Sequence, residues 1–297
     1  MKKGINKIKL KAPAKINLSL DIDGVRSDGF HEVAMIMQSI DLCDKLTIYK
    51  RKCPGVKLQV SGADLPENED NLAYRAAELI LDRAGKQSGV KIDLKKKIPV
   101  AAGLAGGSSD AAAVLKGINH LYSLDFDYED LQKMAAVLGS DTVFCLQGGT
   151  ALAKGRGEVI TQLVDIPRQH LLLVNPDFEV STARIYQQFD LLKPEKHIPT
   201  SRLVDFINSG SNIGGDEGWD NVLEPVTVAL FPDIEDIKKK LNDYKTKMCM
   251  MSGSGPTVFA LLENDIQGKK IIKNWPREKD TLILTTTRRA DKNRIFK

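Results

Sequence analysis

The chain has 297 residues, of which 42% are hydrophobic and 28% charged, so it is long enough for two globular lobes that share a cleft. Its net charge of +4 argues against a dedicated nucleic-acid binder, although a small positive excess suits an enzyme whose ligands are phosphate anions. The four cysteines lack metal-binding spacing, and no apolar run or leader predicts a membrane span or signal peptide, so we expect a cytoplasmic protein.

The first half of the chain is predicted to mix strands with helices. Residues 16–22 alternate apolar and polar side chains, which predicts a strand with one buried face. Lys15 and Asn17 then point the same way from its polar face. Further strands are predicted at 35–40, 45–49 and 150–154, and helices at 71–84, 111–121 and 128–138, with another helix starting near 140.

The second half is predicted to begin near Pro167 and to continue the mixture of strands and helices. A polar linker through Pro194 and Pro199 and a mobile loop at 209–220 interrupt it. Strands are predicted at 171–174, 257–262 and 281–287, and helices at 182–192, 221–230 and 234–243. The interleaving predicts an α+β fold in two layers, with domains at 1–166 and 167–297.

A glycine-rich loop at residues 103–110 runs directly into an alanine-rich helix. Glycines let backbone N–H groups approach an anion closely, and the helix adds its positive N-terminal end. The loop is therefore predicted to bind phosphate. It is neither a Walker A loop nor a GxGxxG motif, and the structural alternative is a flexible loop that only permits tight packing.

Two charged residues could act on a phosphate held there. Asp141, near a predicted helix start, could accept a proton from a hydroxyl, although capping of a helix is the commoner role of such an Asp. Lys15 could stabilise charge on a transferring phosphoryl group, or could simply face solvent. A second glycine-rich turn at 252–256 is either a hairpin loop or the opposite wall of a cleft.

Together these motifs resemble the GHMP kinase superfamily. The similarity rests on Pro13-Ala14-Lys15, on the Gly103–Ser109 loop and on the Gly253-Ser254-Gly255 turn, which occur in the family's order. Within the superfamily the chain is most similar to the branch that phosphorylates a cytidine diphosphate derivative of methylerythritol in non-mevalonate isoprenoid synthesis. The resemblance implies a two-domain GHMP kinase fold, with an N-terminal lobe like domain 2 of ribosomal protein S5 and a ferredoxin-like C-terminal lobe.

The resemblance also implies roles for individual residues. Asp141 is expected to be the catalytic base, and Lys15 to support it and the transferring phosphate. The ATP-binding residues are expected to be Gly103, Leu104, Ala105, Gly106, Gly107, Ser108 and Ser109, with Asn71 and Lys96 near the adenine. The expected substrate-binding residues are Asn17, Phe30, His31, Thr182, Tyr186 and Gly255, with the cytosine between Phe30 and Tyr186. Mg²⁺ is the expected metal, with Ser109 as a ligand by analogy.

Two departures from the family pattern and two alternatives remain open at this stage. Phe30 stands where the family usually has Tyr, and Thr142-Val143 stands where Val-Pro is usual. The protein could instead phosphorylate homoserine, mevalonate or galactose, or be a non-catalytic nucleotide- or RNA-binding relative. The expected partners are ATP and a small-molecule substrate, without nucleic acid or membrane, and the protein is expected to be a monomer or homodimer.

Overall fold

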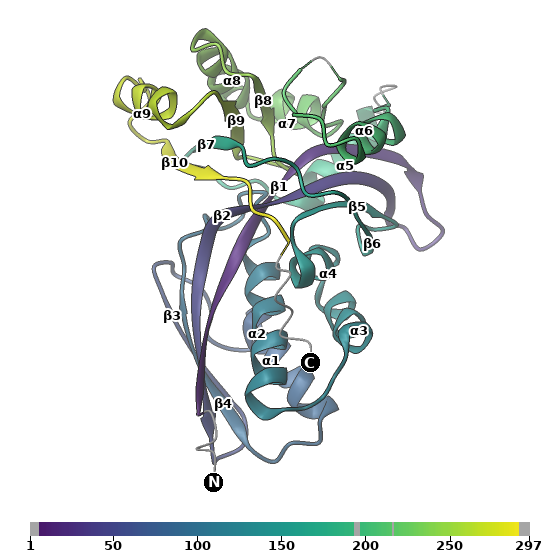
Figure 1. The fold of residues 1–297 in the computed structure, drawn as a ribbon, viewed down its shortest axis with the longest axis vertical. Helices are drawn as coiled ribbons and strands as arrows, with labels where there is room; N and C mark the ends of the chain where they lie inside the picture. Colours follow the sequence, from purple (N-terminus) through teal and green to yellow (C-terminus); the bar gives the residue numbers. More distant parts are fainter. Residues whose placement is uncertain (1–5, 193–196, 216, 291–297) are drawn as a thin grey trace.

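The computed structural model describes residues 6–192, 197–215 and 217–290, which form two sheets with helices packed on them (Figure 1). Part of the predicted linker, including Pro194, lies outside the described residues. The first sheet has the order β3-β4-β2-β5-β6, and β1 also pairs with β2. Its strands are β1 (Lys7–Val25), β2 (His31–Arg51), β3 (Val56–Ser61), β4 (Gly89–Lys95), β5 (Thr150–Lys154) and β6 (Val159–Gln162).

Helices cover one face of this first sheet, with α2 against β1 and β2 and α1 against β3 (Figure 1). The helices are α1 (Leu72–Arg83), α2 (Gly106–Tyr122), α3 (Tyr128–Leu138) and α4 (Ser140–Gln147). Asn71 caps α1, because its side chain accepts a hydrogen bond from the Ala73 N–H. The prediction of a helix over 71–84 is therefore confirmed with its cap.

Strands β1 and β2 differ from the sequence predictions in their burial and in their extent. The segment 14–22 is buried on both faces and not on one, because β1 also contacts the second lobe: the Leu20 N–H donates to Asp220 O, and the Val222 N–H donates to Leu20 O. The two strands predicted at 35–40 and 45–49 are one strand. Its first part pairs with β5 and its second with β4, so the polar residues between them mark a change of neighbour.

The second sheet is antiparallel, with the order β10-β7-β9-β8. Its strands are β7 (His170–Asn175), β8 (Met248–Met251), β9 (Val258–Leu262) and β10 (Thr281–Thr286). Its helices are α5 (Thr182–Leu192), α6 (Thr200–Asn208), α7 (Glu224–Leu230), α8 (Asp233–Asp243) and α9 (Asp265–Lys273). Helix α6 was not predicted. The chain passes between the sheets at 163–169, where the sequence predicts a domain boundary.

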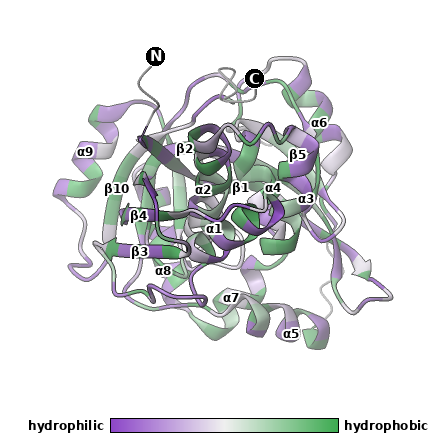
Figure 2. Ribbon diagram, turned by 90° about the horizontal axis from the view of Figure 1, so that it is seen from below, coloured by the Kyte–Doolittle hydropathy of each residue, from purple (hydrophilic) through white to green (hydrophobic). Residues whose placement is uncertain are grey.

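One hydrophobic core reaches into both lobes. It contains Ile16 and Leu18 of β1, Leu115 of α2, and Phe259 and Leu261 of β9. Figure 2 shows peripheral elements such as α9 with both hydrophobic and hydrophilic stretches, as expected of helices that bury one side. Among the described residues, no helix combines the length and apolar character needed to cross a bilayer.

Candidate active site

A cavity with a volume of about 1140 Å³ lies where β1, α2, α4 and α5 meet the turn after β8. Most of the side chains predicted to function line it. Those residues are Lys15, Asn17, Phe30, His31, Asn71, Lys96, Gly103, Leu104, Ala105, Gly106, Gly107, Ser108, Asp141, Thr182 and Tyr186. The structure thus brings together residues from both halves of the sequence, as the two glycine-rich loops suggest.

The glycine-rich loop forms one wall of this cavity. Gly103 has a φ of +73°, and Ala105, the N-cap of α2, has a φ of +54°. Helix α2 then begins at Gly106, five residues before the predicted start. The first N–H groups of a helix have no partner within it, so Gly106, Gly107 and Ser108 present backbone donors and a positive helix end to the cavity.

The loop and the second glycine-rich turn contact each other directly. The hydroxyl of Ser252 donates to the Gly103 carbonyl over 3.0 Å, and the Lys15 N–H donates to the Leu104 carbonyl over 3.1 Å. A Cβ at Gly103 would lie 2.2 Å from the Ser252 carbonyl oxygen. The close approach of the two loops therefore requires glycine at this position.

A lysine and a carboxylate meet beside the phosphate-binding loop. Lys15 Nζ lies 3.5 Å from Asp141 Oδ2 and donates to Asn17 Oδ1 over 2.7 Å. The Lys15 side chain is 5% exposed, whereas that of Asp141 is 32% exposed and reaches the cavity. Asp141 stands in the first turn of α4, whose N-cap is Gly139, so it does not serve as the cap that the structural alternative supposes.

A buried ion cluster stands on another wall. Lys96 Nζ donates to Asp44 Oδ2 over 2.5 Å and to Asp110 Oδ2 over 2.7 Å. Burial lowers the pKa of Lys96, but Asp110 and Asp44 together raise it above its ordinary value. Burial raises the pKa of the Asp110 carboxyl to about 7, against the opposing effect of Lys96. Within the described residues, Asp110 Oδ1 is buried and has no hydrogen-bond partner, although Asp110 lines the cavity.

Aromatic rings close the far end of the cavity. The rings of His31 and Tyr186 lie 4.8 Å apart between centroids at an angle of 43°, and His31 Nε2 is 2.7 Å from Asp190 Oδ1. Phe30 also lines the cavity, but its side chain is 54% exposed, and the Arg156 guanidinium lies over its ring at 5.0 Å. These rings could hold a flat base, although His31 and not Phe30 is the ring beside Tyr186.

Two predicted residues do not line the cavity. The Ser109 hydroxyl donates to the Pro13 carbonyl over 2.7 Å, and Ser109 is 1% exposed. The turn after β8 presents Gly253 and Ser254 to the cavity, whereas Gly255 packs against Met251. Ser254 Oγ lies 2.9 Å from the Thr182 hydroxyl, which links the turn to α5.

The predicted site residues omit several polar side chains that line the cavity. They include Asp110, Arg156, Asp190 and Ser254. Arg156 stands in a Gly-Arg-Gly turn and Ser254 in the second glycine-rich turn, so the glycines beside them were an available signal. Asp190 had no such signal, because it lies within an ordinary amphipathic helix and reaches His31 only through the tertiary fold.

The cavity has no preassembled cluster of metal ligands within the described residues. The one group of potential metal ligands that the described residues bring together is Asp21, Asp23 and His197. None of these three residues lines the cavity. Mg²⁺ in kinases needs only one or two carboxylates, because the nucleotide phosphates supply further oxygens. The partly exposed Asp141 carboxylate fits that requirement, whereas the Ser109 hydroxyl, held by Pro13, does not.

Comparisons with known proteins identify the family to which this chain belongs. A model of the GHMP kinase N-terminal domain matches residues 71–149, and one of the GHMP kinase C-terminal domain matches residues 210–280. A 4-diphosphocytidyl-2-C-methyl-D-erythritol kinase from Alkaliphilus metalliredigens is 43% identical over 270 residues, which cover 91% of this chain and 93% of that protein. The chain belongs to the GHMP kinase family. The predicted family, the α+β class and the assignment as an ATP-dependent kinase are thereby confirmed.

Further relatives agree with this membership. A kinase of the same name from Pelotomaculum thermopropionicum is 44% identical over 93% of this chain and 96% of its own length. A crystal structure of 4-(cytidine 5'-diphospho)-2C-methyl-D-erythritol kinase superposes with a TM-score of 0.80 at 31% identity, covering 94% of this chain and 99% of that one. Homoserine kinase from Cytophaga hutchinsonii shares the GHMP fold. It superposes with a TM-score of 0.75 at 23% identity, covering 98% of this chain and 97% of that one.

Proposed function

We propose that this GHMP kinase transfers the γ-phosphate of ATP to the 2-hydroxyl of 4-diphosphocytidyl-2-C-methyl-D-erythritol, a step of non-mevalonate isoprenoid synthesis. The observation that carries the proposal is the position of the Asp141–Lys15 pair. It lies in one cavity with a phosphate-binding helix start and with the ring pair of His31 and Tyr186. The names of the relatives at 43–44% identity support the substrate.

The residues divide the reaction between them. The N–H groups at the start of α2 bind the ATP phosphates, with Asn71 and Lys96 toward the adenine. Tyr186 and His31 hold the cytosine, and Thr182 and Asn17 contact the methylerythritol end of the substrate. In this arrangement the acceptor hydroxyl and the nucleotide would lie on either side of Asp141, which lines the cavity.

Transfer is direct, without a phosphoenzyme. The oxygen of the substrate hydroxyl bonds to the γ-phosphorus of ATP, and the bond between that phosphorus and ADP breaks. Asp141 accepts the proton that the hydroxyl loses. Lys15, whose Nζ lies 3.5 Å from Asp141 Oδ2, offsets negative charge on the transferring group. When bound with the nucleotide, Mg²⁺ would further neutralise the phosphate charge, and the partly exposed Asp141 carboxylate would be the protein group to hold it.

A panel of acceptors tests the proposal. Purified protein with ATP and Mg²⁺ is offered the cytidyl substrate, homoserine, mevalonate and galactose in parallel, and ADP formation is measured. We expect turnover with the cytidyl substrate alone, because it carries the flat base that the ring pair holds. Turnover with another alcohol would contradict the assigned substrate, and no turnover with any acceptor would contradict the kinase reaction itself.

A further inference from the structure

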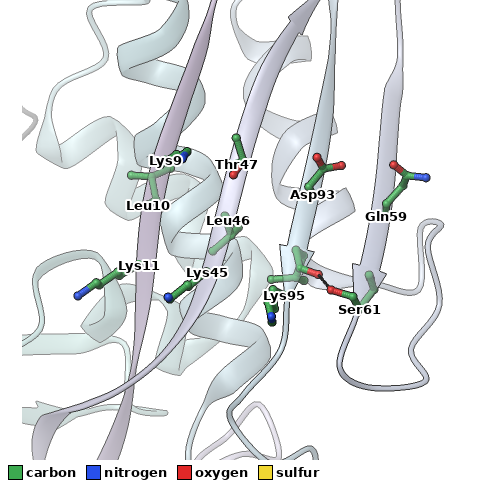
Figure 3. Close-up of a pocket in the computed structure, with 12 residues that line it drawn as sticks. Lys9, Leu10, Lys11, Lys45, Leu46, Thr47, Gln59, Ser61, Asp93 and Lys95 are labelled. Carbon is green, nitrogen blue, oxygen red and sulfur yellow. Dashed lines mark hydrogen bonds between the residues drawn. The ribbon is translucent and has the colours of Figure 1, made fainter.

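Helices α1 and α2 cover one face of the first sheet and leave its other face open. A separate cavity of about 750 Å³ lies there, lined by residues of β1, β2, β3 and β4 (Figure 3). Apolar side chains such as Ile48 and Ile92 are buried, and Ile48 points to Gly117 of α2, so the alternate residues of each strand form the open face. All the residues that line this cavity belong to these four strands.

Strand pairing places three lysines side by side on this face. Lys11 pairs with Lys45, and Lys45 pairs with Lys95, so one row crosses β1, β2 and β4 and ends at Ser61 of β3 (Figure 3). Neighbouring strands lie about 4.8 Å apart, which brings the bases of the three side chains within about 10 Å. Like charges directly opposite each other in a sheet are destabilising.

No acidic side chain among the described residues forms an ion pair with this row of lysines. Asp93, the carboxylate that lines this cavity, is 3.0 Å from Lys91 Nζ. Asp41 and Asp265 line an adjoining cavity with Lys11 and Lys45, but they contact Arg168 and His170 respectively. The three rows of paired residues hold seven lysines and one aspartate, a net charge of +6 that exceeds the +4 of the whole chain. These rows are Lys11, Lys45, Lys95, Ser61; Lys9, Thr47, Asp93, Gln59; and Lys7, Tyr49, Lys91, Lys57.

We propose that this face binds a compact oligophosphate, with the row of Lys11, Lys45 and Lys95 as its anion-binding core. Three adjacent ammonium groups suit a ligand with several closely spaced negative charges, and the cavity has the size of small-molecule sites. Nucleic acid suits it less, because the one aromatic ring in the rows, Tyr49, lies under Lys91 at 5.8 Å and leaves no surface on which bases could stack.

Calorimetric titration of the whole chain with inorganic tripolyphosphate tests the site. The test variant carries Lys11→Gln, Lys45→Gln and Lys95→Gln. The control carries Lys86→Gln, Lys239→Gln and Lys270→Gln, which remove the same charge from exposed positions elsewhere. We expect the test variant to lose one equivalent of bound tripolyphosphate, with at least tenfold weaker affinity at that site, and the control to stay within twofold of wild type.

The remaining outcomes decide against the proposal. Equal stoichiometry and affinity in wild type and test variant, or an equal loss in the control, would show that no specific site exists. A 20-base-pair RNA or DNA duplex that binds this face more tightly than tripolyphosphate would show a nucleic-acid surface instead. Lys45→Gln alone, at the centre of the row, is expected to weaken binding partially and keeps the test valid if the triple variant does not fold.

Discussion

At the scale of single residues, Asp110 couples the nucleotide wall of the cavity to pH. The pKa of its carboxyl is raised from 3.8 to about 7. Because the pKa of Asp110 is higher in the folded state, protonation of its carboxyl stabilises the fold. This stabilisation is complete below the pKa of the unfolded chain, near 4, and is lost as the pH rises to about 7. The difference is worth about 4 kcal/mol at most.

We therefore expect the free energy of unfolding of wild type to decrease from pH 4 to pH 7. The same pH change should cause a smaller decrease, or none, in Asp110→Asn. Denaturant titrations of both proteins at several pH values measure this difference. The variant loses the titrating carboxyl, so its overall stability is lower but this component of its pH slope is absent. Parallel pH profiles for the two proteins would show that Asp110 titrates normally.

Tyr186 is expected to decide the affinity for the cytosine. Burial and, to a smaller extent, the charge of Asp141 raise the pKa of its hydroxyl above the ordinary value. Loss of a base-stacking ring costs about 1–3 kcal/mol, so Tyr186→Ala should raise the KM for the cytidyl substrate about 5- to 150-fold and leave the KM for ATP unchanged. Tyr186→Phe, which keeps the ring, is the matched control, and equal KM values for all three proteins would contradict the assignment.

The residue roles were predictable where a motif marks them and not where the fold alone makes the contact. Lys15 and Asp141 are 126 positions apart, and only their motifs join them before the structure shows the 3.5 Å pair. Ser109 belongs to the same motif as Ser108, but the helix turns its hydroxyl toward Pro13. Membership of a motif therefore predicts the loop better than it predicts the direction of each side chain.

At the scale of elements, the contact between the two glycine-rich loops is sensitive to one methyl group. Gly103→Ala forces a side chain onto a φ of +73° and against the Ser252 carbonyl, so we expect it to lower the free energy of unfolding by about 1–3 kcal/mol. A Cβ at Gly107 would meet only the Leu72 side chain, at 3.4 Å. Gly107→Ala is therefore expected to change stability by less than about 0.5 kcal/mol.

Chemical denaturation of the two glycine variants checks this expectation. Similar losses in both would show that α2 requires glycine for a reason other than the contact with the turn after β8. Unchanged stability of Gly103→Ala would show that the two loops do not meet closely in solution.

The same helix shows why element boundaries were harder to predict than elements. Hydrophobic periodicity locates the body of α2, but its first turn is built of glycine and serine, which are poor helix formers, and the predicted start fell at residue 111. Helix α6 lies between the predicted linker, which runs through Pro199, and the predicted loop at 209–220, and the sequence predicts no element over its short amphipathic pattern. In both places tertiary contacts outweigh local propensity.

At the scale of the whole molecule, one of the two buried clusters among the described residues spans both sheets, and the other lies in the second lobe. Residues of β1, α2 and β9 belong to the same buried cluster, and backbone hydrogen bonds join Leu20 to both Asp220 and Val222. The buried Asn221 amide also donates to the Met251 and Gly253 carbonyls, which connects the segment beside β1 to the second glycine-rich turn. These contacts make each lobe depend on the other.

We therefore expect the chain to unfold in a single calorimetric transition, with equal calorimetric and van't Hoff enthalpies. Two resolved transitions would show that the predicted domains 1–166 and 167–297 are stable separately. The domain boundary itself stays a prediction that this experiment addresses.

The most direct test of the proposed reaction is single-turnover transfer of γ-labelled phosphate from ATP to 4-diphosphocytidyl-2-C-methyl-D-erythritol by wild type and by Asp141→Asn. We expect wild type to label the substrate. The variant, which keeps the shape of Asp141 but cannot accept the proton, should be slower by about 10²- to 10⁴-fold with ATP affinity retained. Transfer by the variant at nearly the wild-type rate would contradict the role of Asp141, and the absence of labelled product with wild type would contradict the proposed function.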